Sequence, residues 1–187
     1  DKETLAEFID AFDGEDLGIV PVPLGNGYYH LRAIYIEQEG VPMIMPYDPT
    51  GHLFNSLYGN PTPDSLGGYI EAILLPRFAL EINRILDLKV NEIHFNDWQT
   101  ALGPVMMDEI YKREKGPANL FTTHNLEYQG LFPGHMTVDT TDAFVEHLLN
   151  QGVLGEHRFA HDTENNFFRI GLNQITVEIF KIGRAHV

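Results

Sequence analysis

The sequence predicts an α/β fold with a parallel sheet, and three observations support this prediction. Glu92 to Phe95 and Asn119 to Thr123 are short apolar strands separated by a helical pattern. Strand, helix and strand in this order are typical of a parallel sheet with right-handed crossovers. The 187 residues are 43% hydrophobic and 21% charged, which is ordinary for a globular chain. This length fits one large domain, or one domain with part of another.

The first part of the chain predicts a helix followed by extended strands. Apolar residues recur at helical spacing from Thr4 to Phe12. Two extended runs, Gly18 to Leu24 and Tyr28 to Glu37, flank Gly25-Asn26-Gly27, a sequence typical of a tight hairpin turn. A third apolar run, Val41 to Met45, ends at a proline.

The middle of the chain predicts a long loop and then a helix. The polar segment from Tyr47 to Gly68 contains several Pro, Gly and Asn residues, and loops of this length are usually functional or mobile. The next helix is expected to have Pro76 in its first turn and to end near Leu88. Its apolar face is predicted to contain Leu75, Phe78, Ala79, Ile82, Ile85 and Leu86.

The second half predicts further helices. Asn96-Asp97 is expected to cap a helix that runs to about Lys115. Helical patterns recur at Asp139 to Leu149 and, more weakly, at Asn165 to Gln174.

Composition excludes several classes of function. Lys and Arg number 12 against 27 Asp and Glu, so the formal charge is 12 − 27 = −15. A field of this sign repels phosphate backbones and anionic lipids, so neither nucleic acid nor a membrane is expected as a partner, whereas neutral sugars are indifferent to it. The chain has no cysteine, which excludes disulfides, a thiolate nucleophile and a sulfur-ligated zinc site.

Polar clusters follow both predicted parallel strands. Asn96-Asp97-Trp98 comes after the first strand and His124-Asn125 after the second. Ligands of open α/β sheets bind outside the carboxyl ends of the strands, so Asp97 and His124 share one rim if the strands are neighbours. An equally weighted alternative is that Asp97 only caps its helix and His124 is a turn residue.

Other candidate motifs are weak. His157 and His161 are four residues apart, but nothing else resembles a metal-binding motif, so no metal is expected. The sequence contains no phosphate-binding G-x-x-x-x-G-K-[ST] loop and no G-x-S-x-G serine elbow.

Two stretches carry a resemblance to a known family. EIHFNDWQTALGPVMM, followed after a helix by NLFTTHNLEYQGLFP, closely resembles the N-terminal domain of bacterial glycogen synthases and plant starch synthases. The family motifs there read roughly HxHDWH and TxHNLxYQG. Upstream, VPMIMPYDPTGHLFNSLYG and RFALEINRIL resemble the family's loop and RFAxFxRAALE helix, so the resemblance covers about Tyr28 to Pro133.

The resemblance implies a fold and an activity. The fold is the N-terminal half of a two-domain GT-B glycosyltransferase with Rossmann-like halves. The activity is transfer of glucose from ADP-glucose to an α-1,4-glucan, with retention of configuration and without a metal or cofactor. The expected location is the cytoplasm, or a plastid for a plant or algal source.

The resemblance also assigns site residues. His124 matches the histidine that touches the donor glucose, with its backbone carbonyl facing the anomeric carbon. Asp97 matches the aspartate near the reacting sugar, and these two are the catalytic candidates. Asn125, Tyr58 of the acceptor-side loop and Gln129 of the YQG motif are the substrate-binding candidates.

Two departures from the family pattern qualify these assignments. Asn96 and Gln99 replace the two histidines that flank Asp97-Trp98 in the family. The family's lysine-glycine loop is expected before Asp1 and its nucleotide-binding domain after residue 187. Residues 1–181 are therefore expected to form a partial N-terminal catalytic domain, inactive alone, and 182–187 (IGRAHV) to be a sequencing-adapter artefact.

Two alternatives to the synthase interpretation remain open. One is a non-catalytic α/β glucan-binding or scaffold domain, which the changes at Asn96 and Gln99 favour. The other is a different retaining GT-B glycosyltransferase, such as a sucrose- or trehalose-forming enzyme, which the YQG motif disfavours.

Overall fold

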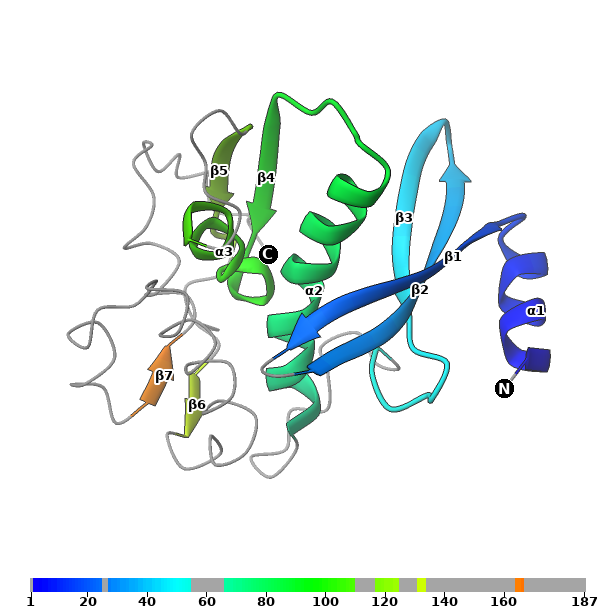
Figure 1. The fold of residues 1–187 in the computed structure, drawn as a ribbon, viewed down its shortest axis with the longest axis horizontal. Coiled ribbons are helices and arrows are strands. Elements are labelled where there is room, and N and C mark those ends of the chain that lie inside the picture. Colours follow the sequence, from blue (N-terminus) through cyan, green and yellow to red (C-terminus); the bar gives the residue numbers. More distant parts are fainter. Residues whose placement is uncertain are drawn as a thin grey trace, which may run out of the picture.

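The structure, a computed structural model, describes residues 2–24, 27–54, 66–109, 117–124, 131–133 and 164–166 (Figure 1). In chain order the elements are α1 (Lys2–Ala11), β1 (Glu15–Leu24), β2 (Gly27–Gln38), β3 (Val41–Tyr47), α2 (Leu66–Ile85), β4 (Glu92–Asn96), the 3-10 helix η1 (Trp98–Thr100), α3 (Gly103–Glu109), β5 (Ala118–Thr122), β6 (Leu131–Pro133) and β7 (Glu164–Asn166). Helix α2 lies between the β1-β2-β3 sheet and the β4-β5 pair. The predicted α/β fold class is confirmed.

The predicted hairpin is confirmed, and it forms part of an antiparallel sheet with β2 between β1 and β3. Strands β1 and β2 pair from Glu15 and Tyr35 down to Leu24 and Gly27, and β3 pairs with the other side of β2. Alternate residues of this sheet, among them Val22 and Leu31, are buried against α2. The core between sheet and helix comprises Val20, Val22, Leu31, Ala33, Leu53, Ile70, Leu74, Phe78 and Ile82.

Helix α1 contacts the opposite face of the same sheet. The Phe8 ring lies 6.1 Å from the Tyr47 ring, centroid to centroid. Tyr47 pairs with Arg32 of β2, and successive side chains of a strand point to opposite faces, so this contact is on the face away from Leu31. Ile34 points away from α2 and is nevertheless fully buried, so this face of the sheet is covered at Ile34 as well.

Strand β3 continues through the proline that was expected to end it. Pro42 and Pro46 both have partners in β2, namely Glu37 and Ala33. Among the described strands, β3 is at the edge of its sheet. Proline has no N–H to donate, but on an edge strand its nitrogen can face the side that has no partner strand. No hydrogen bond of the sheet is then lost, so the strand tolerates both residues.

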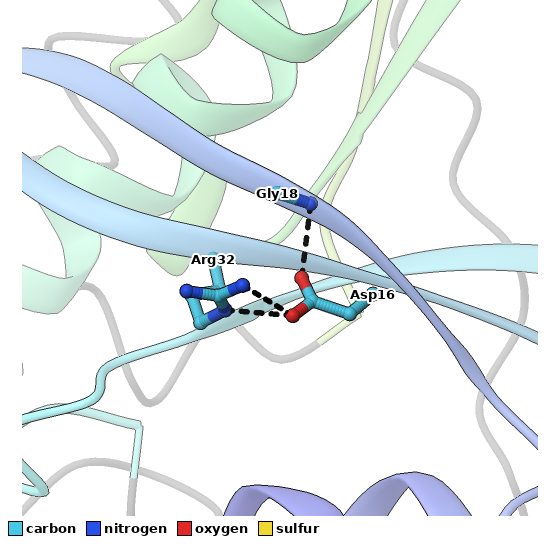
Figure 2. A network of polar contacts seen from close by, with 3 residues as sticks. All are labelled: Asp16, Gly18 and Arg32. Carbon is cyan, nitrogen blue, oxygen red and sulfur yellow. Dashed lines mark hydrogen bonds and ion pairs between the residues drawn. The ribbon is translucent and has the colours of Figure 1, made fainter. Parts of the chain in front are cut away.

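An ion pair stabilises a β-bulge between Asp16 and Gly18 (Figure 2). Asp16 accepts hydrogen bonds from Arg32 Nε at 2.9 Å, from Arg32 Nη2, and from the Gly18 N–H at 2.9 Å. Burial alone would raise the pKa of Asp16, but the bonds and charge of Arg32 and the Gly18 N–H lower it below its ordinary value. Gly18 has φ of 103°, a conformation that favours glycine.

Helix α2 differs from its prediction in two ways. Pro76 is inside the helix and fully buried, not in the first turn, and the helix ends at Ile85 instead of near Leu88. The predicted apolar face is right for Phe78 and Ile82, which are buried. It is wrong for Ala79, Ile85 and Leu86, which are exposed. The helix packs on β1 at one side and on η1 and α3 at another, so its buried surface is wider than a single stripe.

The second half of the described chain forms a parallel pair, as predicted. Strand β4 pairs with β5 from Glu92 and Ala118 to Asn96 and Thr122. The expected continuous helix from Asp97 is wrong over 98–109, because the chain forms η1 and then begins α3 at Gly103. Pro104 lies in the first turn of α3, where backbone N–H groups make no helical hydrogen bond, so a proline is tolerated there. Inside one continuous helix the same proline would remove a helical hydrogen bond, so it separates η1 from α3.

The helices predicted at the C-terminal end are tested only in part. Residues 110–116 and the predicted helix at Asp139 to Leu149 lie outside the described residues. Asn165 and Asn166 belong to strand β7, which pairs with β6, so the prediction of a helix beginning at Asn165 is wrong there.

Replacement of Gly103 by alanine should destabilise the junction of α3 and β4. A Cβ atom at Gly103 would lie 2.1 Å from Cε1 of Phe95, whose side chain is only 3% exposed. We expect Gly103→Ala to lower the free energy of unfolding by about 1–3 kcal/mol, the usual cost of overpacking a core. Urea unfolding measures this. Gly27→Ala is the control, since only the Leu24 carbonyl oxygen lies within 4.0 Å of its added Cβ; equal losses in both variants would contradict the packing account.

Candidate functional site

Asp97 and His124 lie at the same edge of the parallel pair. Asp97 directly follows β4, and His124 comes two residues after Thr122, the last residue of β5. Asn96 pairs with Thr122, and the Asp97 N–H extends the ladder by donating to the Thr122 carbonyl at 2.8 Å. The predicted juxtaposition at the carboxyl ends of adjacent parallel strands is confirmed.

The Asp97 side chain holds the backbone of His124. Asp97 Oδ1 accepts the His124 N–H at 2.6 Å. Asp97 precedes η1 in the N-cap position, but its side chain makes no capping hydrogen bond. The alternative that Asp97 serves only as a helix cap is therefore wrong, because its carboxylate bonds across to the next strand's loop.

The backbone of Asp97 is strained. Its φ of 56° and ψ of −178° fall in a region that is populated almost only by glycine. Such a conformation costs about 1–3 kcal/mol and is concentrated at functional sites. The contacts on either side keep it in place, since the Asp97 N–H bonds to Thr122 and the Asp97 carbonyl accepts the Thr100 N–H at 3.1 Å.

The His124 ring contacts a second residue of β4. His124 Nε2 lies 3.1 Å from Asn96 Oδ1. Two residues earlier on β4, His94 Nε2 lies 2.6 Å from Thr122 Oγ1. Side-chain contacts therefore connect the carboxyl ends of β4 and β5 at two successive positions.

These groups suit a neutral, hydroxyl-rich ligand. His124 and Asn96 are exposed and Asp97 is half-buried, so their remaining donor and acceptor atoms are within reach of a bound molecule. A carboxylate beside an imidazole and an amide can orient hydroxyl groups and stabilise positive charge. Among the described residues, no group of three or more His, Asp or Glu is placed to hold a metal ion.

The structure describes only one of the other residues discussed for the site. Tyr58, Asn125 and Gln129 lie outside the described residues, so their roles stay predictions. Trp98 is half-buried at the start of η1, and η1 lies against α2.

Sequence reasoning missed two carboxylates that fix the segment after β3. Asp48 is 6% exposed and accepts hydrogen bonds from the N–H groups of Thr50, His52 and Leu53 and from the Thr50 hydroxyl. Burial would raise the pKa of Asp48, but these bonds lower it from its ordinary value. The Asp-Pro-Thr-Gly sequence at 48–51 is typical of such turns and could have indicated it.

A second carboxylate joins this segment to α2. Glu71 Oε1 accepts the Phe54 N–H at 2.7 Å. Burial raises the pKa of Glu71, and the bond from Phe54 offsets this only in part. Residues 48–54 are thus fixed to the end of β3 at one side and to α2 at the other.

No helix in the described part of the chain is both long and apolar enough to span a membrane.

Comparison with known proteins identifies clear relatives. The family model for the starch synthase catalytic domain matches residues 2–175. A glycogen synthase of Anaeromyxobacter dehalogenans (strain 2CP-C) is 36% identical over 133 residues, covering 66% of this chain and 27% of that protein. A glycogen synthase of Thermosipho melanesiensis is 43% identical over 65 residues, covering 33% of this chain and 14% of that protein.

A solved structure has the same fold. The catalytic domain of starch synthase IV from Arabidopsis thaliana, bound to ADP and acarbose, superposes with a TM-score of 0.63 at 23% identity. The match covers 86% of this chain and 32% of that one. The chain thus spans about a quarter to a third of the length of these longer matches.

Proposed function

Because the chain belongs to the starch synthase catalytic domain family, we propose that it supplies part of the active site of a glucosyltransferase. The enzyme extends an α-1,4-glucan from ADP-glucose, with retention of configuration and without a metal or cofactor. Residues 1–181 contribute to the N-terminal catalytic domain, and 182–187 are not part of it. The bound ADP and acarbose of the related starch synthase IV support a nucleotide-sugar donor and a glucan acceptor.

The hydrogen bond from the His124 N–H to Asp97 is the observation that carries this proposal. Glucosyl transfer passes through a transition state with positive charge at the anomeric carbon. A carbonyl dipole and a carboxylate near that carbon stabilise this charge, provided that they are already in position. Asp97 supplies the carboxylate and also fixes the main chain of the residue whose carbonyl is expected to face the sugar.

The remaining substrate contacts are proposed from the family motifs. Asn125 and Gln129 follow His124 in the THNLEYQG stretch; Asn125 binds the donor, and Gln129 is a further substrate-binding residue. Tyr58 belongs to the loop after residues 48–54 and contacts the acceptor glucan. The anchoring of that segment by Asp48 and Glu71 supports a loop whose start has a defined position.

The alternative of a non-catalytic glucan-binding domain loses part of its support. That interpretation depended on the replacement of two family histidines by Asn96 and Gln99. Asn96 contacts the His124 ring, so at this position the replacement keeps a polar contact at the rim.

His124→Ala tests the proposal in the enzyme that carries this chain. We expect kcat for transfer from ADP-glucose to malto-oligosaccharide to fall by about 10²–10³-fold, with a smaller change in KM, because the contact tightens as charge develops. His30→Ala, an exposed histidine of β2, is the control and should retain full activity. Unchanged kcat in His124→Ala, or no transfer by the unmodified enzyme, would refute the proposed role.

A further inference from the structure

Asn96 contacts both the His124 ring and the backbone of its own strand. Its Oδ1 atom lies 3.1 Å from Nε2 of His124, and its Nδ2 atom donates to the His94 carbonyl at 3.4 Å. We propose that Asn96 is a positioning residue that holds the His124 ring in one orientation and in its Nε2–H tautomer. The effect on catalysis rests on the proposed function, whereas the tautomer itself does not.

The amide of Asn96 has only one arrangement that satisfies both neighbours. A backbone carbonyl only accepts hydrogen bonds, so the amide nitrogen of Asn96 faces the His94 carbonyl. The amide oxygen then faces His124, and this oxygen also only accepts. His124 Nε2 must therefore carry the proton, and in the neutral ring Nδ1 is left as a hydrogen-bond acceptor.

Two consecutive residues thus fix His124 by separate atoms. Asp97 holds the backbone N–H at 2.6 Å, and Asn96 holds the ring at 3.1 Å. Asn96 is itself fixed, because it is the last residue of β4, pairs with Thr122, and accepts the Thr100 hydroxyl on its carbonyl at 2.7 Å. An exposed imidazole without this contact would sample several rotamers and both tautomers.

The fixed tautomer determines what the ring can recognise. The Nδ1 lone pair of this tautomer can accept a hydrogen bond from a hydroxyl group, and a sugar offers such groups without a charge. The Nε2–H is already committed to Asn96. In the proposed active site, Nδ1 of His124 therefore accepts a hydrogen bond from a hydroxyl group of the donor glucose. The ring does not donate a hydrogen bond to a sugar oxygen.

Nitrogen-15 NMR of the histidine-labelled 187-residue chain tests the tautomer without any substrate. At a pH where the ring is neutral, two-bond nitrogen–proton correlations should show His124 as the Nε2–H form alone. Asn96→Leu removes the acceptor at similar volume and should give a mixture of tautomers. Asn96→Asp keeps an acceptor oxygen and should restore the Nε2–H form.

Thr122→Val is the matched control in the same spectrum. It removes the hydroxyl that contacts His94, so it should change the His94 signals and leave those of His124 unaltered. Identical His124 signals in the wild-type chain and Asn96→Leu, or an Nδ1–H form in the wild type, would overturn the inference. Amide spectra confirm that each variant is folded before its histidine signals are compared.

A kinetic comparison separates this inference from the proposed function. In the enzyme that carries this chain, Asn96→Leu should lower kcat by about 10–100-fold, as expected for a misplaced group, and Asn96→Asp should recover most of the loss. If kcat is unaffected although the tautomer changes, the positioning role is wrong and the proposed function stands. If the unmodified enzyme transfers no glucose, the proposed function fails and the NMR result still decides the tautomer.

Discussion

Replacement of Asp97 by asparagine should lower kcat by about 10²–10³-fold in the enzyme that carries this chain, with little change in KM. The amide keeps the shape of the carboxylate and an oxygen that can accept the His124 N–H, so the loop geometry is retained. What is lost is the negative charge that the proposed function places beside the reacting sugar. Charge of this kind matters most in the transition state, so the loss appears in kcat.

Asp97→Gly gives the complementary result. Glycine adopts φ of 56° and ψ of −178° without strain, so this variant should unfold at an equal or higher urea concentration than the wild type. It nevertheless removes both the charge and the contact with His124, and kcat should fall at least as far as in Asp97→Asn. Wild-type kcat in both variants would show that Asp97 is structural and takes no part in transfer.

Replacement of Asp48 by asparagine should cause a large loss of stability. One carboxylate oxygen, Oδ2, accepts the N–H groups of both His52 and Leu53. An amide nitrogen in its place cannot accept, and the Leu53 N–H is buried. We expect a loss of about 2–3 kcal/mol in the free energy of unfolding, the cost of leaving buried donors unsatisfied.

The Asp48 variant should also change the response to acid. The pKa of Asp48 is lowered in the folded chain, so its carboxylate stabilises the fold above the ordinary Asp pKa of about 3.9. That contribution is lost as pH falls through the lowered native pKa, and Asp16 behaves in the same way. Glu71, with a raised pKa, acts in the opposite sense and adds stability as pH falls through its native pKa.

Urea unfolding at pH 7 and near pH 3 measures both effects. Asp48→Asn should be less stable than the wild type at pH 7. The difference should shrink at the lower pH, where the Asp48 carboxylate of the unfolded wild type takes up a proton more readily than that of the folded chain. A constant difference at the two pH values would contradict the assigned role of the Asp48 charge. Thr50→Val, which removes only the hydroxyl donor to Asp48, should lose less than Asp48→Asn at pH 7.

The elements that could be predicted are those marked by a short, characteristic stretch of sequence. Gly25-Asn26-Gly27 between two extended runs predicted the hairpin, because only a few residue types suit such a turn. The β4-β5 pair followed from strand, helix and strand in short order. Once that pair was expected to be parallel, the meeting of Asp97 and His124 followed from the rule that carboxyl ends share one edge.

The features that could not be predicted depend on tertiary packing. Proline ordinarily marks the start of a helix. Helix α2 nevertheless contains Pro76 in the middle of its sequence, and it packs on β1 at one side and on η1 and α3 at another. Nothing local indicates that Asp97 adopts a glycine-like conformation or that Asn96 faces the His124 ring. Both arise from the register of Asn96 against Thr122, which brings side chains 28 residues apart in sequence into contact.

Amide hydrogen exchange at His124 tests most directly whether Asp97 organises this site. In the wild-type chain the His124 N–H should exchange slowly, and in Asp97→Gly its exchange should be faster by about tenfold or more, as expected for loss of a bond to a charged acceptor. The Thr100 N–H, which bonds to the Asp97 backbone carbonyl, should keep its rate. An unchanged rate at His124, with faster exchange at Thr100, would instead show that Asp97 acts as a helix cap and would contradict the proposed site.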